Sequence, residues 1–170
     1  MERNMRRIRQ LLSQEETVRI LESGKVAVWA VAGDDGYPYA VPINYVYHAG
    51  CIYVHCARQG HKLDAIRRNP KCSMCIVDKD DVVADEFTSY FRSVIAFGIA
   101  EVVEELTEII EALKWLSCKY CPGIDPSDEI QKFINNVCIV RIRLTEITGK
   151  EAIELVRMRT MSIPNKNSAK

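Results

Sequence analysis

The residues best suited to bind an anion lie in segment 58–62, where a β-rich run gives way to a glycine and then to a helical pattern. Free N–H groups at a helix start and the positive end of its dipole favour a phosphate at such a turn. Arg58, His61 and Lys62 would add cationic side chains there. A solvated basic turn without a ligand would look the same, so from these residues alone both interpretations carry equal weight.

An uncharged, aromatic and apolar segment, residues 36–45, precedes this turn. Pro42 cannot donate a ladder hydrogen bond, so a strand containing it is expected at a sheet edge, a bulge or a barrel rim. The backbone groups beside Pro42 could face a flat heterocycle. An ordinary core hairpin is the competing interpretation, and the neighbouring anion turn is what favours a site.

Other common sites are not predicted. The sequence has no G-x-G-x-x-G, no phosphate-binding P-loop, no G-x-S-x-G elbow and no H-E-x-x-H pair. No spacing rule supports a metal site built from His55, Cys56 and His61. Lys plus Arg and Asp plus Glu both number 23, so the basic excess of a general nucleic-acid binder is missing. The longest uncharged stretch, 36–57, contains prolines and glycines and fits two buried strands better than a membrane span.

The seven cysteines indicate a reducing compartment. Their number is odd and no secretory signal is visible, so we expect free thiols and a cytoplasmic location. Cys72 and Cys75 lie in a predicted strand, where residues three apart point to opposite faces. Cys118 and Cys121 lie where a helix is predicted to end. Buried thiols that act as small hydrophobes are the favoured interpretation of both pairs, and a redox pair at Cys118 and Cys121 is the alternative.

Periodicity predicts the elements that must position these residues. Six strands are expected, over 25–32, 39–47, 51–56, 72–77, 90–103 and 137–144. Four helices are expected, the first after a Ser13–Glu16 capping box, the others over 61–69, over 107–120 and from Asp125. Gly98 predicts a bulge or bend. A loop is expected at 78–81, a last edge segment at 149–159 and a frayed polar tail at 164–170.

Short turns between most strands imply antiparallel hairpins. The prediction is therefore a mainly β fold, an antiparallel β-barrel with peripheral helices, in a single domain over 1–170 with its core at about 13–151. A closed or partly closed barrel would also remove exposed strand edges.

Several of these pieces, in their order and spacing, resemble the FMN-binding split barrel, the fold of pyridoxamine 5'-phosphate oxidase. They are Tyr39-Ala-Val-Pro-Ile-Asn44, Tyr53-Val-His55, Gly60-His-Lys62 with Asn69-Pro70, Tyr90-Phe-Arg-Ser-Val94, and Gly98. The similarity covers roughly residues 13–151. It is closer to the nitroimidazole-resistance branch of this family, the 5-nitroimidazole reductases, than to the oxidase itself.

The resemblance implies a homodimer with FMN, or FAD, in a groove between subunits. It implies cofactor contacts from Tyr39, Ala40, Val41, Pro42, Ile43, Asn44, Val54, His55, Arg58, His61, Lys62, Arg92 and Ser93. His61 and Lys62 would hold the phosphate with Arg58 as helper, and Arg92 and Ser93 would reach the flavin from a neighbouring strand. His55 matches a histidine proposed to take part in nitro-group reduction, so it is the expected catalytic residue.

The implied activity is an FMN-dependent oxidoreductase that reduces a small planar or nitroaromatic substrate, with His55 as proton donor. A non-catalytic flavin- or haem-binding sensor or storage protein is the alternative. Oxidation of vitamin B6 is not expected, because His61-Lys62 replaces the oxidase's Arg-Lys pair and segment 157–165 lacks its arginine-rich pattern.

Overall fold

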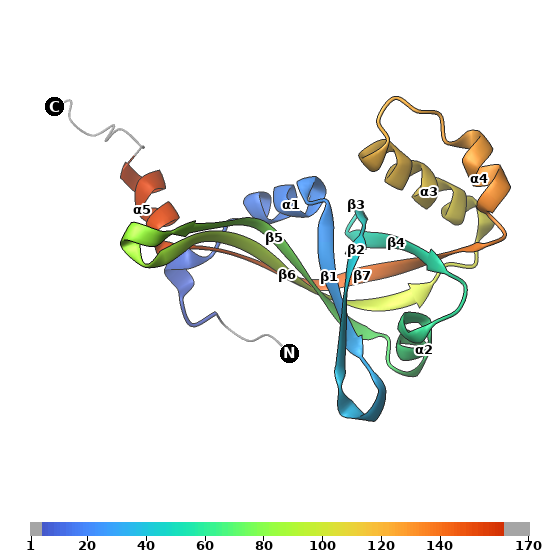
Figure 1. Cartoon of the computed structure of the whole chain (residues 1–170), viewed down its shortest axis with the longest axis horizontal. Coiled ribbons are helices and arrows are strands. Elements are labelled where there is room, and N and C mark those ends of the chain that lie inside the picture. Colours follow the sequence, from blue (N-terminus) through green and yellow to red (C-terminus); the bar gives the residue numbers. More distant parts are fainter. Residues whose placement is uncertain (1–4, 162–170) are drawn as a thin grey trace.

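The computed structural model describes residues 5–161, which form one seven-stranded, fully antiparallel sheet (Figure 1). The strands are β1 (Val26–Ala32), β2 (Pro38–Asn44), β3 (Val46–His48), β4 (Cys51–Ala57), β5 (Lys71–Val83), β6 (Thr88–Val102) and β7 (Val137–Glu151). Their order across the sheet is β2-β1-β5-β6-β7-β4-β3. The predicted fold class, mainly antiparallel β with peripheral helices, is confirmed.

The sheet curls until β2, at one edge, contacts β4, near the other edge. No ladder joins these two strands within residues 5–161, so the barrel is split rather than closed. Alternate residues of β1 point into it: Ala27, Trp29 and Val31 are buried. The split leaves β2 as an edge strand, as Pro42 predicted.

Gly98 marks the predicted irregularity in β6. The register between β6 and β7 shifts between Phe97 and Gly98. A Cβ on Gly98 would lie 2.7 Å from the carbonyl oxygen of Arg143, so no larger residue fits without a shift of the neighbouring strand.

The predicted strand 39–47 is in fact two strands. Tyr45 separates β2 from β3, and its side chain is fully buried with its hydroxyl donating to the carbonyl oxygen of Leu21 at 2.9 Å. Its backbone N–H donates to the hydroxyl of Tyr120 at 3.0 Å instead of to a strand.

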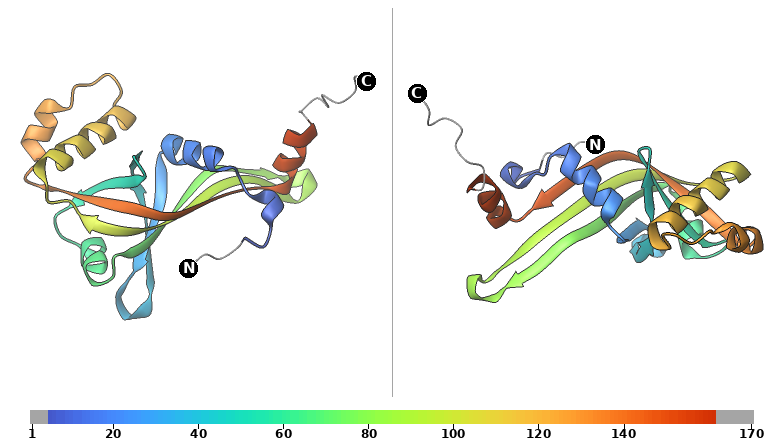
Figure 2. Two further views of the ribbon diagram at one scale, coloured as in Figure 1. Left: turned by 180° about the vertical axis from the view of Figure 1, so that it is seen from behind. Right: turned by 90° about the horizontal axis from the view of Figure 1, so that it is seen from above.

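The prediction of a loop at 78–81 is wrong, because β5 and β6 continue as a long hairpin through these residues. Figure 2 shows this hairpin extending away from the body of the protein. Both of its faces meet solvent there, so no apolar alternation is needed to form it. The charges are matched instead: the Lys79 ammonium lies 2.9 Å from Asp81, and the Arg92 guanidinium lies 3.6 Å from Asp78.

Within residues 5–161, five α-helices surround the sheet: α1 (Gln14–Ser23), α2 (His61–Arg68), α3 (Leu106–Tyr120), α4 (Ser127–Phe133) and α5 (Ile153–Met161). The capping box predicted at the start of α1 is present, with the Ser13 hydroxyl accepting from the N–H of Glu16 at 3.2 Å. None of the helices in the described part of the chain has the length and hydrophobicity to span a membrane.

The prediction of a last edge segment at 149–159 is also wrong. Its first residues end β7, and the rest forms α5. Two carboxylates hold α5 in place, since the Arg159 guanidinium lies 2.7 Å from Glu16 and 2.9 Å from the buried Glu151. The predicted tail 164–170 lies outside the described residues.

Helices cover both sides of the sheet at the β4–β7 end. Figure 1 shows α3 and α4 on one side and α2 on the other. Even-numbered residues of β4, such as Ile52 and Val54, pack in the barrel core with Leu63 of α2. The odd-numbered Tyr53 packs with Leu116 of α3 in a second cluster. Strand alternation therefore decides which neighbour each β4 side chain meets.

Candidate functional site

The predicted anion turn, Gly60 with the first residues of α2, forms an open helix start that we call the α2 corner. Gly60 has φ +130°, a conformation that side-chain-bearing residues rarely adopt. Its carbonyl oxygen accepts from Leu63 and Asp64, so the N–H groups of His61 and Lys62 have no acceptor within the helix. The side chain of Lys62 is half-buried, and its ammonium makes no hydrogen bond or ion pair with any other residue between 5 and 161. An anion would satisfy these donors.

His61 is engaged on its other side. Its ring packs against Tyr39 of β2 with ring centroids 4.2 Å apart, and its Nε2 lies 3.5 Å from a carboxylate oxygen of Asp34. Arg68 pairs with the same carboxylate, and that ion pair holds the pKa of Asp34 below its usual value. These contacts fix the tip of the β1–β2 hairpin against α2, and they place one end of β2 at the α2 corner.

Arg58 does not point into the corner. Its guanidinium donates to the carbonyl oxygen of Asn135 at 2.9 Å, which ties the loop after β4 to the loop before β7. Its expected role as a phosphate helper therefore requires that this hydrogen bond break.

The edge strand β2 connects the α2 corner to the other half of the site. It pairs only with β1, so alternate backbone groups along its outer edge have no strand partner in the described chain. Tyr39, Val41 and Ile43 pack toward the barrel core, whereas Ala40, Pro42 and Asn44 are exposed. From Tyr39 to Asn44 the strand covers roughly 17 Å.

Strand alternation separates the predicted site residues of β4. Val54 is fully buried in the barrel core, so its side chain cannot contact a ligand. His55 is exposed on the side of α3 and α4. Its imidazole makes no hydrogen bond to any residue that the structure describes. Cys56 faces the barrel side. Burial is the main cause that raises the pKa of its thiol to about 11, and the adjacent Cys138 thiol adds to this effect, whereas the positive charge of Lys62 acts in the opposite direction.

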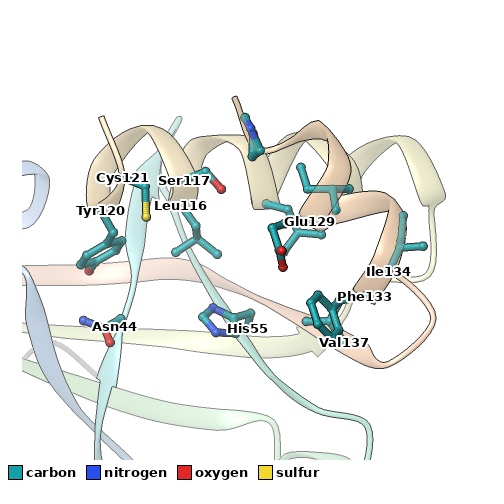
Figure 3. Close-up of a pocket in the computed structure, with 13 residues that line it drawn as sticks. Asn44, His55, Leu116, Ser117, Tyr120, Cys121, Glu129, Phe133, Ile134 and Val137 are labelled. Atoms are coloured by element: carbon teal, nitrogen blue, oxygen red, sulfur yellow. The ribbon is translucent and has the colours of Figure 1, made fainter. Parts of the chain in front are cut away.

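His55 opens into a cavity of about 380 Å³ between the sheet and helices α3 and α4 (Figure 3). We call it the α3–α4 cavity. The sheet contributes Asn44, His55 and Val137. The two helices and the loop between them contribute Leu113, Leu116, Ser117, Tyr120, Cys121, Pro126, Glu129, Ile130, Phe133 and Ile134.

Tyr120 fixes the end of α3 over the sheet. Its hydroxyl accepts from the N–H of Tyr45 at 3.0 Å and lies 2.5 Å from the carbonyl oxygen of Lys25 and 2.8 Å from that of Tyr45. The Lys119 ammonium lies 4.1 Å from the centre of the Tyr45 ring, and burial lowers its pKa to about 8. This anchor holds the roof of the cavity.

The sequence did not identify the cavity wall on α3 and α4. The sequence predicts both helices, but no motif marks their residues as binding residues. The available signal was that α4 is amphipathic yet short; the structure shows that none of its residues is buried.

Arg92 and Ser93 are not brought to the rest of the site within one chain. The ladder aligns Val54 with Val140 and Val140 with Val102, which lies ten positions along β6 from Arg92. That separation is roughly 30 Å along the strand. Arg92 is instead 3.3 Å from the carboxylate of Glu151.

The cysteine pairs form no metal site. No cluster of three or more His, Cys, Asp or Glu side chains able to hold a metal ion occurs in residues 5–161. Cys72 is buried and Cys75 lies on the other face of β5, as predicted. Cys118 and Cys121 are both exposed, so the prediction of buried thiols is wrong for this pair.

Residues 13–151 match the family model described as pyridoxamine 5'-phosphate oxidase. No curated protein matches the sequence. Among solved structures, a hypothetical protein from Mycobacterium tuberculosis is 21% identical with a TM-score of 0.77, and the match covers 98% of each chain.

Two further structures bear functional names. One, from Bacteroides thetaiotaomicron, is named for proposed 5-nitroimidazole antibiotic resistance; it is 21% identical with a TM-score of 0.70, covering 83% of this chain and 86% of that one. The other, a FAD-binding protein from Mesorhizobium loti, is 25% identical with a TM-score of 0.62, covering 84% and 97%.

Proposed function

The chain belongs to the pyridoxamine 5'-phosphate oxidase family, and from this membership we propose that it is an FMN-dependent oxidoreductase that reduces a small planar, nitroaromatic substrate. The observation that carries the proposal is the course of β2. Its open edge runs from the α2 corner, with the free Lys62 ammonium, to Asn44 beside the unpartnered His55. A cofactor with a phosphate at one end and a flat ring at the other matches that arrangement.

The α2 corner supplies the phosphate contacts in this proposal. The N–H groups of His61 and Lys62 would donate to phosphate oxygens, and the Lys62 ammonium would balance the charge. The backbone of β2 from Tyr39 to Asn44 would face the ring. FAD is the alternative cofactor, and its phosphates would meet the same donors.

His55 supplies the proton in the proposed reaction. A flavin held there would supply the electron pair, with an external reductant such as a reduced nicotinamide as its source. His55 would donate a proton from its ring N–H to a nitro oxygen, which leaves as water once a second proton arrives from solvent. The imidazole is exposed to the cavity and bonded to nothing else in the described chain, so it is available to do this.

A homodimer would complete the site. Residues paired across β2, β1, β5 and β6 form an exposed sheet face, the outer sheet face, which includes Pro42, Val28, Val77, Ser93 and Phe97. Val77 is 59% exposed and Phe97 46%, an unusual density of apolar surface for a sheet facing water. A second copy packed on this face could bring its own Ser93 toward the cofactor, which one chain cannot do. Arg92 lies on the opposite face of β6, beside Glu151.

The proposal is tested by anaerobic reoxidation. The protein loaded with FMN is reduced with dithionite and mixed with para-nitrobenzyl alcohol or, as control, para-methylbenzyl alcohol. We expect the flavin absorbance to return only with the nitro compound, with matching loss of that compound. A reduced protein that stays bleached with both would contradict the proposal.

Haem binding without turnover is the second candidate. The observation that favours it is the His55 imidazole, an available iron ligand at the floor of an apolar cavity. A Soret band in the freshly purified protein would support this function over the first.

A cytoplasmic location is proposed for either function, because all seven cysteines are free.

A further inference from the structure

We propose that the α3–α4 cavity binds the body of the substrate and that it selects flat, apolar molecules that are neutral or cationic over anionic ones. This inference rests on the proposed function, since it assumes that His55 faces the reacting group. It adds the site that holds the remainder of the molecule and the charge that this site prefers.

The cavity has the size and the apolar surface of a small-molecule site. Its volume of about 380 Å³ lies within the range of small-molecule sites, which are concave and mostly apolar. Leu113 and Leu116 form one wall, and Ile130, Phe133 and Ile134 form the other. Phe133 remains 45% exposed, and α4 contains no buried residue at all. The apolar face of α4 therefore borders open space that a flat apolar molecule could fill.

Two of the polar side chains that line the cavity, those of Glu129 and Asn44, present acceptor oxygens. Figure 3 shows the Glu129 carboxylate projecting from α4 into the cavity, above the level of His55. Its ion pair in the described chain is with Lys132 at 3.9 Å, and both side chains are exposed, so the pairing is weak. The Asn44 amide nitrogen donates to the carbonyl oxygen of Lys25, which leaves its side-chain oxygen as an acceptor. A carboxylate and an amide oxygen favour ligands that carry a donor or a positive charge and disfavour anions.

Three matched probes test the charge preference: para-nitrobenzylamine, para-nitrobenzyl alcohol and para-nitrobenzoate. Each is titrated calorimetrically into the oxidised, FMN-loaded protein, so binding is measured without turnover. We expect the amine and the alcohol to bind, and the benzoate to bind several-fold more weakly than either. Tightest binding of the benzoate would overturn the charge preference.

Variants on opposite walls test the location. Ser117→Phe fills the cavity from α3 and should weaken binding of all three probes about ten-fold or more, because the ring takes their space. Cys118→Phe adds the same ring to the same helix at an exposed position and should leave binding unchanged. Should Ser117→Phe fail to fold, Ile130→Trp fills the cavity from α4. Wild-type affinity in either folded cavity variant would overturn the inference.

A second pair tests Glu129. Glu129→Gln should narrow the preference for the amine over the benzoate by about two- to five-fold, the usual range for an exposed charge pair. Asp128→Asn, on the same helix and outside the cavity lining, should leave the preference unchanged. An unaltered preference in Glu129→Gln would remove this carboxylate from the selection.

The binding and reoxidation experiments fail separately. Probe binding that Ser117→Phe abolishes, without any reoxidation, would support the cavity and refute the reductase. Reoxidation that proceeds equally in Ser117→Phe would support the reductase and refute the cavity as its substrate site.

Discussion

Replacing Lys62 by alanine should weaken FMN binding strongly while leaving the fold intact. The ammonium of Lys62 has no ion-pair partner in residues 5–161, so its removal leaves no carboxylate without a counter-charge. The side chain is half-buried at the first turn of α2, beside two backbone N–H groups that also lack acceptors. A phosphate there would be the only strong partner of all three donors.

The size of the effect follows from the loss of one charge-assisted hydrogen bond. Such bonds contribute about 1–3 kcal/mol, which corresponds to roughly a 5- to 150-fold increase in the Kd for FMN. The half-buried position argues against the lower end, because solvent screens the interaction less than at a fully exposed site.

Flavin fluorescence titration measures this change directly. Riboflavin, which lacks the phosphate, serves as the second ligand, and its affinity should not depend on Lys62. Arg67→Ala is the matched control, since it removes one positive charge from the far end of the same helix, where Arg67 pairs with Asp64 at 3.2 Å. Equal FMN affinity in wild type and Lys62→Ala, or an equal loss for FMN and riboflavin, would refute the assignment of the phosphate to the α2 corner.

Three further substitutions test the other parts of the account. His55→Gln should slow nitro reduction about 100-fold or more with FMN affinity unchanged, and unaltered turnover in stopped-flow assays would exclude His55 from proton transfer. Tyr120→Phe leaves the Tyr45 N–H without its acceptor and should cost about 1–3 kcal/mol, seen in calorimetry as a lower Tm; an unchanged Tm would show that the anchor adds no stability. Lys119→Met should stabilise the protein at neutral pH by about 1 kcal/mol, a value discounted for partial exposure and for the ring contact. Because the folded-state pKa of Lys119 is lowered to about 8, the cost of its charge is fully present below that pH. That cost disappears as pH rises toward the pKa of an unfolded lysine. The unfolding free energies of wild type and Lys119→Met, measured by denaturation, should therefore converge above pH 8. A difference that stays constant with pH would contradict the lowered pKa of Lys119.

Local chemistry made most of the sheet predictable. Pro42 indicated an edge strand and Gly98 a bulge, and both follow from a backbone requirement that no distant contact can override. The capping box at Ser13 is equally local, because its partners lie three residues apart.

The errors arise where tertiary contacts decide the structure. Segment 78–81 is charged and looks like a loop, yet it pairs with β6 because salt bridges on the exposed hairpin replace apolar alternation. The segment after Ala152 became a helix because Arg159 reaches Glu16 and Glu151, which are remote in sequence.

The site, too, has a part that the local sequence predicts and a part that only tertiary contacts create. The α2 corner was predictable, since a glycine, a helix start and a lysine are consecutive in the sequence. Alternation along β4 explains why Val54 is unavailable and His55 exposed, but only the structure shows which face meets α3 and α4. The cavity wall was not predictable, because its residues come from two helices without a motif and meet His55 only through the fold.

A crystal structure of the wild-type protein grown with FMN would locate the cofactor itself. We expect phosphate oxygens against the N–H groups of His61 and Lys62, and the ring along β2 within reach of His55. A phosphate bound elsewhere, with only solvent at the start of α2, would contradict it.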